Sequence, residues 1–268
     1  MTWLQALLLG LVQGLTEFLP VSSSGHLAIG REILGVEASG DLVFEIAVHA
    51  ATVLATIVVF RKEIWRLLCG LFRFQYNDET DYILKICLSM IPVLLVGLFL
   101  KDKVETLFSS LLVVGLALVV TAMLLFFSDH LAPKRNAVKP MPRNGIGWGQ
   151  AFLVGIGQAF AVIPGLSRSG TTISTGLLCG VRRESVAQFS FLMVLVPILG
   201  EAFLDLTGGE MAASSIGTLP LVVGFLAAFV SGLFACKLMI AMVKKARLSW
   251  FALYCAIVGL LVILFTIF

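Results

Sequence analysis

Charged side chains are scarce in this sequence. Only 13% of its 268 residues are charged, whereas 59% are hydrophobic, and a soluble domain carries about 25% charged residues. The net charge of +3 is too small to indicate a surface for nucleic acid. The composition therefore excludes an ordinary soluble domain. It indicates a protein that is solvated largely by the lipid bilayer and has no nucleic-acid partner.

The cysteines form no pattern either. No two of them are spaced as C-x-x-C, which argues against a zinc site and a disulfide framework. We interpret them as small hydrophobic residues. They are Cys69, Cys87, Cys179, Cys236 and Cys255. A cleavable signal peptide is also not expected, because no basic segment precedes the first apolar run and Glu17 interrupts it.

Long apolar runs are what the sequence has instead. Runs of about 18 to 20 residues are long enough to cross the hydrocarbon core of a bilayer. Three such runs follow one another in each half of the chain, at residues 42–60, 83–100, 111–127, 189–206, 219–239 and 250–268. The polar, basic and proline-rich stretch between the halves reads as a linker. The sequence therefore predicts an all-α integral membrane protein.

Each half also begins with a segment that breaks before it could span a membrane. Residues 1–33 are apolar up to Phe18 and then break at LPVSSSGH, and residues 148–181 are apolar up to Ile163 and then break at PGLSRSGTT. Proline and glycine stop helices at these points. Irregular backbone at membrane depth is tolerated only inside protein or along a wet cavity. We therefore expect one re-entrant helical hairpin in each half.

The two halves match weakly when one is shifted along the other. Gln13 then falls on Gln158, and Ser22 on Ser167. Each half holds three full spans, an odd number, so two such copies in one chain must have inverted topology. The expected architecture is a single membrane domain, residues 1–268, made of repeat 1 (1–128), a basic linker (129–147) and repeat 2 (148–268).

Lysine and arginine predict the orientation, because cytoplasmic loops carry them in excess. Basic side chains gather at residues 61–73, in the linker and at residues 237–247, and the turns between these segments hold few or none. We therefore expect the three basic segments in the cytoplasm. The first hairpin should then enter the membrane from outside, and the second from the cytoplasm.

Polar side chains are concentrated in the two broken turns, which should meet near the middle of the membrane. Arg168 at a helix N-terminus beside hydroxyls is suited to bind a phosphate. Glu17 can bind a hard divalent cation, Mg²⁺ or Ca²⁺, and His26 can move a proton or attack phosphorus. The first turn brings Gln13, Glu17, Ser22, Ser23, Ser24 and His26, and the second brings Gln158, Ser167, Arg168, Ser169, Thr171 and Thr172.

Structural interpretations compete with these. An intramembrane pair of Glu17 and Arg168 can be structural, and serine or threonine in membrane helices often bonds only to backbone. His49 has no polar company in its span, so we interpret it as a packed histidine. Arg31 and Arg183 are interpreted as anchors at the membrane interface.

Three known motifs do not fit the second turn. GLSRSG lacks the second glycine of a nucleophile elbow, and no G-K-[ST] follows as in a Walker loop. SSGH is shared with lipid phosphatases of the phosphatidic-acid type. Their partner motif needs a histidine where this sequence has Ser174, so that resemblance fails.

Another family fits much better. QGLTEFLPVSSSGH at residues 13–26 and PGLSRSGTT at residues 164–172 closely resemble the two signatures of the undecaprenyl-diphosphate phosphatases of the bacitracin-resistance type. The resemblance extends along the whole chain. The family has Glu or Gln at the first position of its acidic pair. That position is Gln13 here, which leaves Glu17 as the carboxylate of the pair.

The resemblance implies an enzyme of the bacterial plasma membrane whose site opens on the outer face. It would cleave undecaprenyl diphosphate into inorganic phosphate and undecaprenyl phosphate, the lipid carrier used in cell-wall synthesis. It also implies a divalent cation, with Glu17 as ligand. By motif matching, the catalytic positions are Glu17, His26, Ser167, Arg168 and Thr172, with Gln13 and Ser23 in support. The remaining polar residues expected to help bind substrate are Ser22, Ser169, Thr171 and Gln158.

A transporter or flippase of an anionic isoprenoid lipid is the rival reading, because inverted repeats with broken helices are typical of transporters. The hydrolytic set of Glu17, His26 and Arg168 favours the enzyme. The sequence leaves open whether His26 acts as base or nucleophile, and whether Glu17 binds metal or orients water. It does not define the oligomeric state, and a homodimer is compatible with it.

Overall fold

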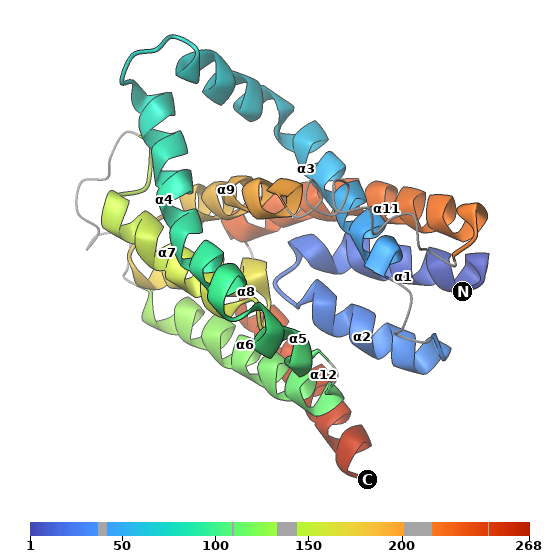
Figure 1. Ribbon diagram of the computed structural model, residues 1–268. Helices are drawn as coiled ribbons and strands as arrows, with labels where there is room; N and C mark the ends of the chain where they lie inside the picture. The colour runs from blue at the N-terminus through green and yellow to red at the C-terminus, as the bar shows by residue number, and fades with distance from the viewer. Residues whose placement is uncertain (37–41, 109, 133–143, 201–215, 246) are drawn as a thin grey trace.

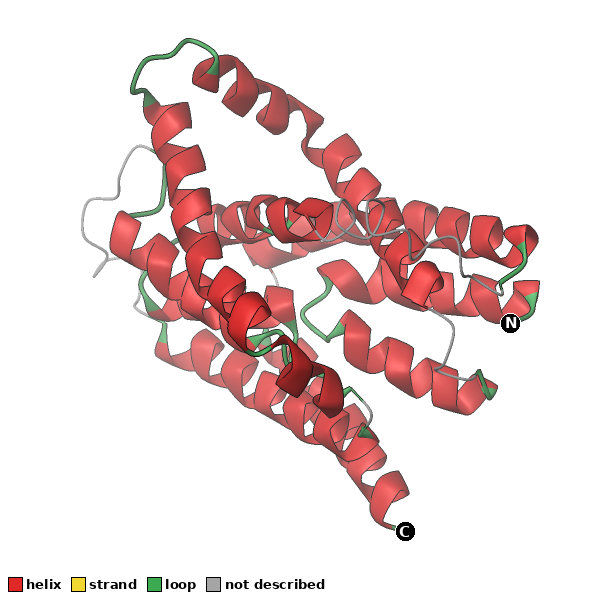
Figure 2. Cartoon of the chain, in the orientation of Figure 1, coloured by secondary structure: helices red, strands yellow, loops and turns green. Residues whose placement is uncertain are grey.

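The computed structural model describes residues 1–36, 42–108, 110–132, 144–200, 216–245 and 247–268, and this part of the chain contains helices and no strand (Figure 2). The helices are α1 (Trp3–Phe18), α2 (Ser23–Leu34), α3 (Leu42–Leu71), α4 (Asp78–Phe99), α5 (Lys101–Leu107), α6 (Leu111–Leu131), α7 (Trp148–Phe160), α8 (Arg168–Leu178), α9 (Arg183–Met193), α11 (Thr218–Lys245) and α12 (Ser249–Ile267). The expected all-α fold is confirmed.

Among the described residues, six helical segments are long and apolar enough to cross a membrane, as expected. They are Val43–Leu71, Asp78–Phe99, Leu111–Leu131, Arg183–Gly200, Thr218–Val243 and Ser249–Ile267. Most of the central linker, and most of the expected turn between residues 205 and 218, lie outside the described residues.

Polar side chains mark where several helices begin. Thr2 and Gln5 form a reciprocal capping box at α1, in which Gln5 Oε1 accepts from the Thr2 N–H at 2.7 Å. Asn77 caps α4, because its Oδ1 accepts from the Thr80 N–H at 2.8 Å. Each cap satisfies a backbone donor that would otherwise have no partner at the helix start, so these residues fix where the helices begin.

Helices from the two halves of the chain pack against each other. The main partner of α1 is α11, the main partner of α7 is α4, and α6 lies beside α12 (Figure 1). A Cβ added to Gly10 of α1 would lie 2.3 Å from the Gly224 oxygen in α11, and one added to Gly155 of α7 would lie 2.3 Å from the Ser89 oxygen in α4. Membrane helices associate through such close contacts between small residues, since lipid supplies no hydrophobic drive.

A buried lysine joins the end of the linker to α4. Lys85 is 1% exposed, and its Nζ donates to Asp81 Oδ2 at 2.5 Å and to Asn144 Oδ1 at 3.1 Å. Asn144 also donates from its Nδ2 to Asp81. The charge of Lys85 is therefore paired, as a buried charge requires. The end of the linker is held against the first turns of α4.

Asp129 makes a similar connection at the end of α6. Arg183 of α9 donates to its Oδ1, and the Ser249 hydroxyl at the start of α12 donates to its Oδ2 at 2.7 Å. Arg31 of α2 pairs with Glu45 of α3 at 2.5 Å. The interpretation of Arg31 and Arg183 as simple interfacial anchors therefore missed two ion pairs between helices.

Candidate functional site

The turn between α1 and α2 holds the first group of polar side chains. Pro20 follows the end of α1, and Ser22 takes a φ of 72°. The Ser22 hydroxyl accepts from the Gly25 N–H at 3.2 Å and so caps α2. Because proline cannot continue the helix and the hydroxyl starts a new one, the chain reverses within a few residues. Glu17 and Ser23 are left on either side of the turn.

The turn between α7 and α8 holds the second group. Gly165 has a φ of 88°, and a Cβ added there would lie 2.4 Å from the Val114 oxygen of α6. Glycine is therefore required both for the backbone conformation and for space. Ser167 caps α8 by accepting from the Gly170 N–H at 3.1 Å, and its own N–H donates to Thr121 Oγ1 at 3.0 Å. Contacts with α6 thus hold this turn in place.

The two turns touch each other. Ser169 Oγ donates to the Leu19 carbonyl oxygen at 3.1 Å. A cavity of about 340 Å³ lies between the turns and is lined by hydroxyls of both, together with Glu17 and Arg168. The hydroxyls are those of Ser22, Ser23, Ser24, Ser167 and Ser169. The prediction that the turns meet is confirmed for these residues.

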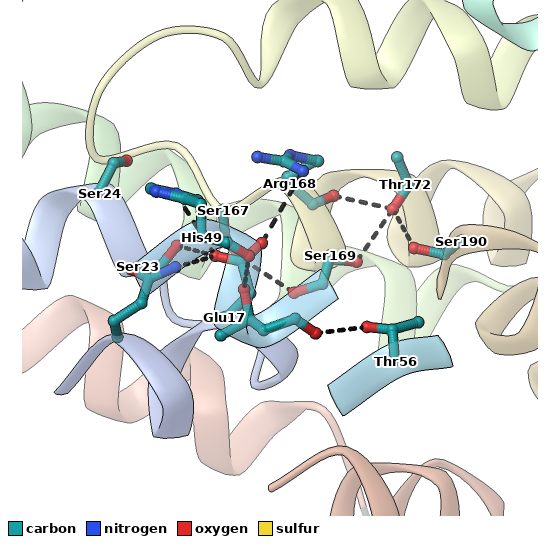
Figure 3. A network of polar contacts seen from close by, with 12 residues as sticks. Glu17, Ser23, Ser24, His49, Thr56, Ser167, Arg168, Ser169, Thr172 and Ser190 are labelled. Carbon is teal, nitrogen blue, oxygen red and sulfur yellow. Dashed lines mark hydrogen bonds and ion pairs between the residues drawn. The ribbon is translucent and has the colours of Figure 1, made fainter. Parts of the chain in front are cut away.

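Glu17 is the centre of a polar network (Figure 3). Its Oε2 accepts from Ser23 Oγ at 2.5 Å and from Gln13 Nε2 at 3.0 Å. Its Oε1 faces Arg168, whose Nη1 lies 3.8 Å away, and the Glu17 side chain is only 9% exposed. The carboxylate is therefore held in a fixed orientation by two neutral donors, with a cation beside its other oxygen.

Arg168 is not fully satisfied by the protein. Its Nη1 is buried and has no hydrogen-bond partner among the described residues, and 3.8 Å to Glu17 exceeds a hydrogen bond. A buried donor without an acceptor is costly. Arg168 is also the first residue of α8, where the free N–H groups of a helix N-terminus favour an anion. A phosphate oxygen would supply the acceptor that Arg168 lacks.

Other predicted hydroxyls organise the start of α8. Thr172 Oγ1 donates to the Arg168 carbonyl oxygen at 2.8 Å and lies 2.6 Å from Ser190 Oγ of α9. Thr171 Oγ1 is buried and has no hydrogen-bond partner in the described ranges. Thr172 therefore connects α8 to α9 behind Arg168.

Two predicted site residues lie apart from this network. His26 points to α12. Its Nδ1 lies 2.7 Å from the Ser22 carbonyl oxygen and its Nε2 lies 2.8 Å from the Tyr254 hydroxyl. The rings of His26 and Tyr254 are stacked. Gln158 Nε2 contacts Met90 Sδ at 3.7 Å. Neither His26 nor Gln158 lines the cavities at Glu17, and their catalytic and binding roles stay predictions.

His49 lies in the site, although the sequence analysis set it aside. Its Nε2 is 4.0 Å from Glu17 Oε2, and its side chain lines the cavity between the turns. The interpretation of His49 as a packed histidine without polar company is therefore wrong. A signal was present in the sequence, because Glu45, His49, Thr52 and Thr56 recur at helical spacing along α3. Such a polar stripe is unusual in a span.

A second cavity of about 350 Å³ shares Glu17, Arg168 and Ser169 with the first. Its walls come from α1, α3, α8, α9 and the segment that follows α9. Three further hydroxyls that the sequence analysis did not select, those of Thr52, Thr56 and Ser190, also line it. The apolar wall consists of Phe18, Val53, Phe191, Val194 and Ile198.

The residues that could hold a divalent cation lie around Glu17. Within the described ranges, no group of three or more His, Cys, Asp or Glu residues gathers at one point. Gln13 Oε1, however, is buried without a hydrogen-bond partner there, and Ser23 Oγ contacts the carboxylate. Mg²⁺ is usually held by one or two carboxylates together with substrate phosphates. The set Glu17, Gln13 and Ser23 meets that requirement when phosphate oxygens complete it.

Comparisons with known proteins agree with the geometry. The family model described as bacitracin resistance protein BacA matches residues 6–261. Proteins named undecaprenyl-diphosphatase from Bacteroides fragilis and Parabacteroides distasonis are each 55% identical, over 98% of both chains for the first and over 100% of this chain and 99% of the relative for the second. One of the same name from Methanococcus vannielii is 38% identical over 98% of this chain and 100% of its own. With six long apolar helices in the described part of the chain, this protein is a multi-pass membrane protein that belongs to the BacA family.

Proposed function

We propose that this protein hydrolyses undecaprenyl diphosphate to undecaprenyl phosphate and inorganic phosphate, and so recycles the lipid carrier of cell-wall synthesis. The observation that carries the proposal is the buried Arg168 Nη1, which has no acceptor among the described residues and lies beside Glu17 in a cavity lined by both signature turns. Membership of the BacA family and the printed name of its relatives support a phosphatase rather than a transporter.

Arg168 binds and stabilises the group that is transferred. Its guanidinium can bind two phosphate oxygens at once through a planar fork. Phosphoryl transfer depends mainly on positioning and on donors that face the developing charge. The backbone N–H groups at the start of α8 add to this effect, and the contact of Thr172 with Ser190 keeps that helix end in place.

Glu17 prepares the opposite side of the reaction centre. Its carboxylate is held by Ser23 and Gln13, and in this proposal it orients an attacking water or hydroxyl and accepts hydrogen bonds from it. The geometry brings Ser23, rather than His26, within hydrogen-bond distance of this carboxylate. A proton-transfer role for His26 would require its ring to leave Tyr254.

A divalent cation, Mg²⁺ or Ca²⁺, is part of the proposal. Glu17 would hold it, with Gln13 Oε1 and Ser23 Oγ as neutral oxygen ligands. Bound there, it would offset charge on the diphosphate oxygens. Because the described residues supply a single carboxylate at this place, most of the affinity for the cation should come with the substrate.

The second cavity suits the start of the lipid tail. It begins at Glu17 and Arg168, and its wall contains Phe18, Phe191 and Ile198. Apolar side chains next to a diphosphate site remove the first isoprene units from water. We propose that the diphosphate occupies the polar cavity and that the tail leaves along α3 and α9.

We also propose the inverted repeat architecture. Under the sequence match, α7 corresponds to α1 and α4 to α11. The packing follows the same relation, because α1 contacts α11 and α7 contacts α4, each through a matched glycine, Gly10 and Gly155. This supports two interlocked copies, each with a hairpin and three spans.

The orientation proposal has support from two contacts. Asn144, at the end of the linker, bonds to Asp81 beside the turn that follows α3. Ser249, beside the turn that follows α11, bonds to Asp129 at the start of the linker. These contacts place all three basic segments at one end of the molecule. We propose that this end is cytoplasmic. We propose the plasma membrane as location and a site that opens on the outer face.

The proposed activity is tested with purified protein in detergent and a polyprenyl diphosphate. We expect one inorganic phosphate per substrate molecule, loss of activity in EDTA and recovery with excess Mg²⁺ or Ca²⁺. If the folded protein released no phosphate but moved the lipid across vesicle membranes, the proposal of hydrolysis would be wrong and the protein would be a transporter. Activity that survives the chelator would remove the cation from the proposal and leave the hydrolysis in place.

A further inference from the structure

We propose that Ser190 is a positioning residue of this site, which acts on Arg168 through Thr172. The inference rests on the proposed function and extends it to α9, a helix that neither signature motif includes. Ser190 Oγ lies 2.6 Å from Thr172 Oγ1, and Thr172 Oγ1 donates to the Arg168 carbonyl oxygen at 2.8 Å. Figure 3 shows both contacts at the start of α8.

The direction of these hydrogen bonds follows from the groups that form them. A carbonyl oxygen only accepts, so the bond to Arg168 uses the single hydroxyl proton of Thr172. The proton between the two hydroxyls must then come from Ser190. The opposite direction would give up the bond to the carbonyl and leave the Ser190 proton without an acceptor among the described residues. Ser190 therefore donates to Thr172, and Thr172 donates to Arg168.

Ser190 differs from the two threonine hydroxyls of α3 that line the second cavity. Thr52 donates to the His49 carbonyl oxygen at 2.7 Å, and Thr56 donates to the Thr52 carbonyl oxygen at 2.9 Å. Both bond to their own helix, as hydroxyls in membrane helices often do. Ser190 bonds instead to another helix, is 4% exposed and lines the cavity together with Arg168. Its bond therefore holds α8 directly beside the reactive groups.

The bond from Thr172 to the carbonyl four residues earlier shapes the first turn of α8. Such a bond often bends a helix, and a helical threonine can choose between two rotamers and two carbonyls. Thr172 Oγ1 lies 2.8 Å from the Arg168 oxygen and 3.3 Å from the Ser169 oxygen. The donor from Ser190 holds one rotamer and so holds the bend at Arg168. Because a misplacement of about 1 Å can cost about 10²-fold in rate, this bend decides how well Nη1 meets the phosphate.

The chain offers a matched control for this pair of hydroxyls. Ser174, also on α8, donates to Ser128 Oγ of α6 at 3.0 Å, and Ser128 donates to the Leu125 carbonyl oxygen at 3.0 Å. Both serines are buried, and neither lines the cavities at Glu17. This pair also holds α8 against a neighbouring helix, but it ends on the backbone of α6. Any general effect of losing a buried hydroxyl between helices should therefore appear at Ser128.

The test compares Ser190→Ala with Ser128→Ala and with Ser190→Thr, which keeps the hydroxyl. The measurements are phosphate release from a polyprenyl diphosphate, Tm in detergent, and affinity for an isoprenoid methylenediphosphonate, in which a CH₂ bridge prevents hydrolysis. We expect Ser190→Ala to lower kcat about tenfold, less than the loss of Arg168 itself, because the guanidinium is displaced but not removed. Affinity for the methylenediphosphonate should change less than about threefold, because the positive charge stays in the cavity.

The two comparison variants should behave differently. Ser190→Thr should recover most of kcat, because it restores the donor to Thr172. Ser128→Ala should lower Tm about as much as Ser190→Ala and keep the kcat of wild type. An equal loss of kcat in Ser128→Ala would overturn the inference, as would a Ser190→Ala protein with the kcat of wild type. So would a Ser190→Thr protein that is as slow as Ser190→Ala with an unchanged Tm.

A double variant shows whether Ser190 acts through Thr172. In a Thr172→Val background, which lacks the hydroxyl that Ser190 holds, Ser190→Ala should lower kcat no further. Single-turnover phosphate release measures these slow variants. A further tenfold loss in that background would show that Ser190 acts without Thr172 and would overturn the inference. Absence of phosphate release from wild type would count against the proposed function itself, and the wild-type arm of the same assay reads it separately.

Discussion

The guanidinium of Arg168 approaches the Glu17 carboxylate to 3.8 Å without forming a hydrogen bond to it. A structural ion pair in a membrane interior is normally closed by short hydrogen bonds, because desolvated charges need full compensation. Here Glu17 takes its short bonds from Ser23 and Gln13, and Arg168 Nη1 takes none among the described residues. The pair is therefore open to a ligand between or beside its charges.

Replacement of Arg168 should separate catalysis from stability. Arg168→Lys keeps the charge but loses the planar fork, so activity should fall by roughly 10²-fold or more, the scale of one preorganised donor in a dry site. Arg168→Ala should be worse, and both proteins should fold. Phosphate release and Tm in detergent are the measurements. A sharp drop in the Tm of Arg168→Ala that is restored by adding Glu17→Gln would instead make the pair structural.

Gly165→Ala should damage the second turn. The new Cβ would meet the Val114 oxygen at 2.4 Å, and the φ of 88° disfavours any side chain. We expect a loss of about 1–3 kcal/mol of stability and a larger loss of activity, because the start of α8 must shift. Gly149→Ala is the control, since among the described residues nothing beyond its own stretch of helix lies within 4 Å of the position that a Cβ would take; its Tm and activity should stay near wild type. Equal effects of the two changes would refute the steric argument.

Asp129→Ala should lower stability while leaving the chemistry intact. It removes an acceptor of Arg183 and of Ser249 at the junction of α6, α9 and α12. We expect a loss of about 1–3 kcal/mol, less than for a fully buried pair because the Arg183 side chain is 32% exposed. Tm should fall, and kcat per folded molecule should not change. A normal Tm with low kcat would place Asp129 in the reaction instead.

Cysteine labelling tests the orientation. In a background without the native cysteines, Thr218→Cys at the start of α11 should react with an impermeant thiol reagent in intact cells, because the basic segments at the other end of that helix are expected inside. Asn136→Cys in the linker should react only after the membrane is opened. The reverse labelling pattern would show the opposite orientation, in which the site opens toward the cytoplasm.

Hydropathy predicted the spans better than their ends. The first span was expected at residues 42–60, but α3 continues to Leu71, because a polar and basic sequence can extend a helix beyond the apolar window. The first hairpin breaks after Phe18, as predicted. The first helix of the second half, α7, ends at Phe160, whereas the apolar run continues to Ile163. Apolar residues in the turn toward Pro164 look helical by composition alone.

Most contacts between side chains on different helices could not be predicted from the sequence. The motif turns were predicted to meet, and residues of both line one cavity. His49 was missed because its partner, Glu17, lies on another helix and no local pattern joins the two. His26 sits beside Tyr254, 228 positions away. Spacing within a motif reports neighbours on one helix, whereas these partners are set by how distant helices pack.

The packing of α1 on α11 has a consequence for how the protein is made. During synthesis α1 is complete when its partner helix does not yet exist, since α11 begins at Thr218. Long-range contacts of this kind form late, and early segments wait in a partly assembled state. The reverse dependence holds for α7, which finds α4 already in the bilayer. Packing of α7 on α4 can therefore begin early, whereas the helices around the cavity at Glu17 are all in place only after nearly the whole chain has left the ribosome.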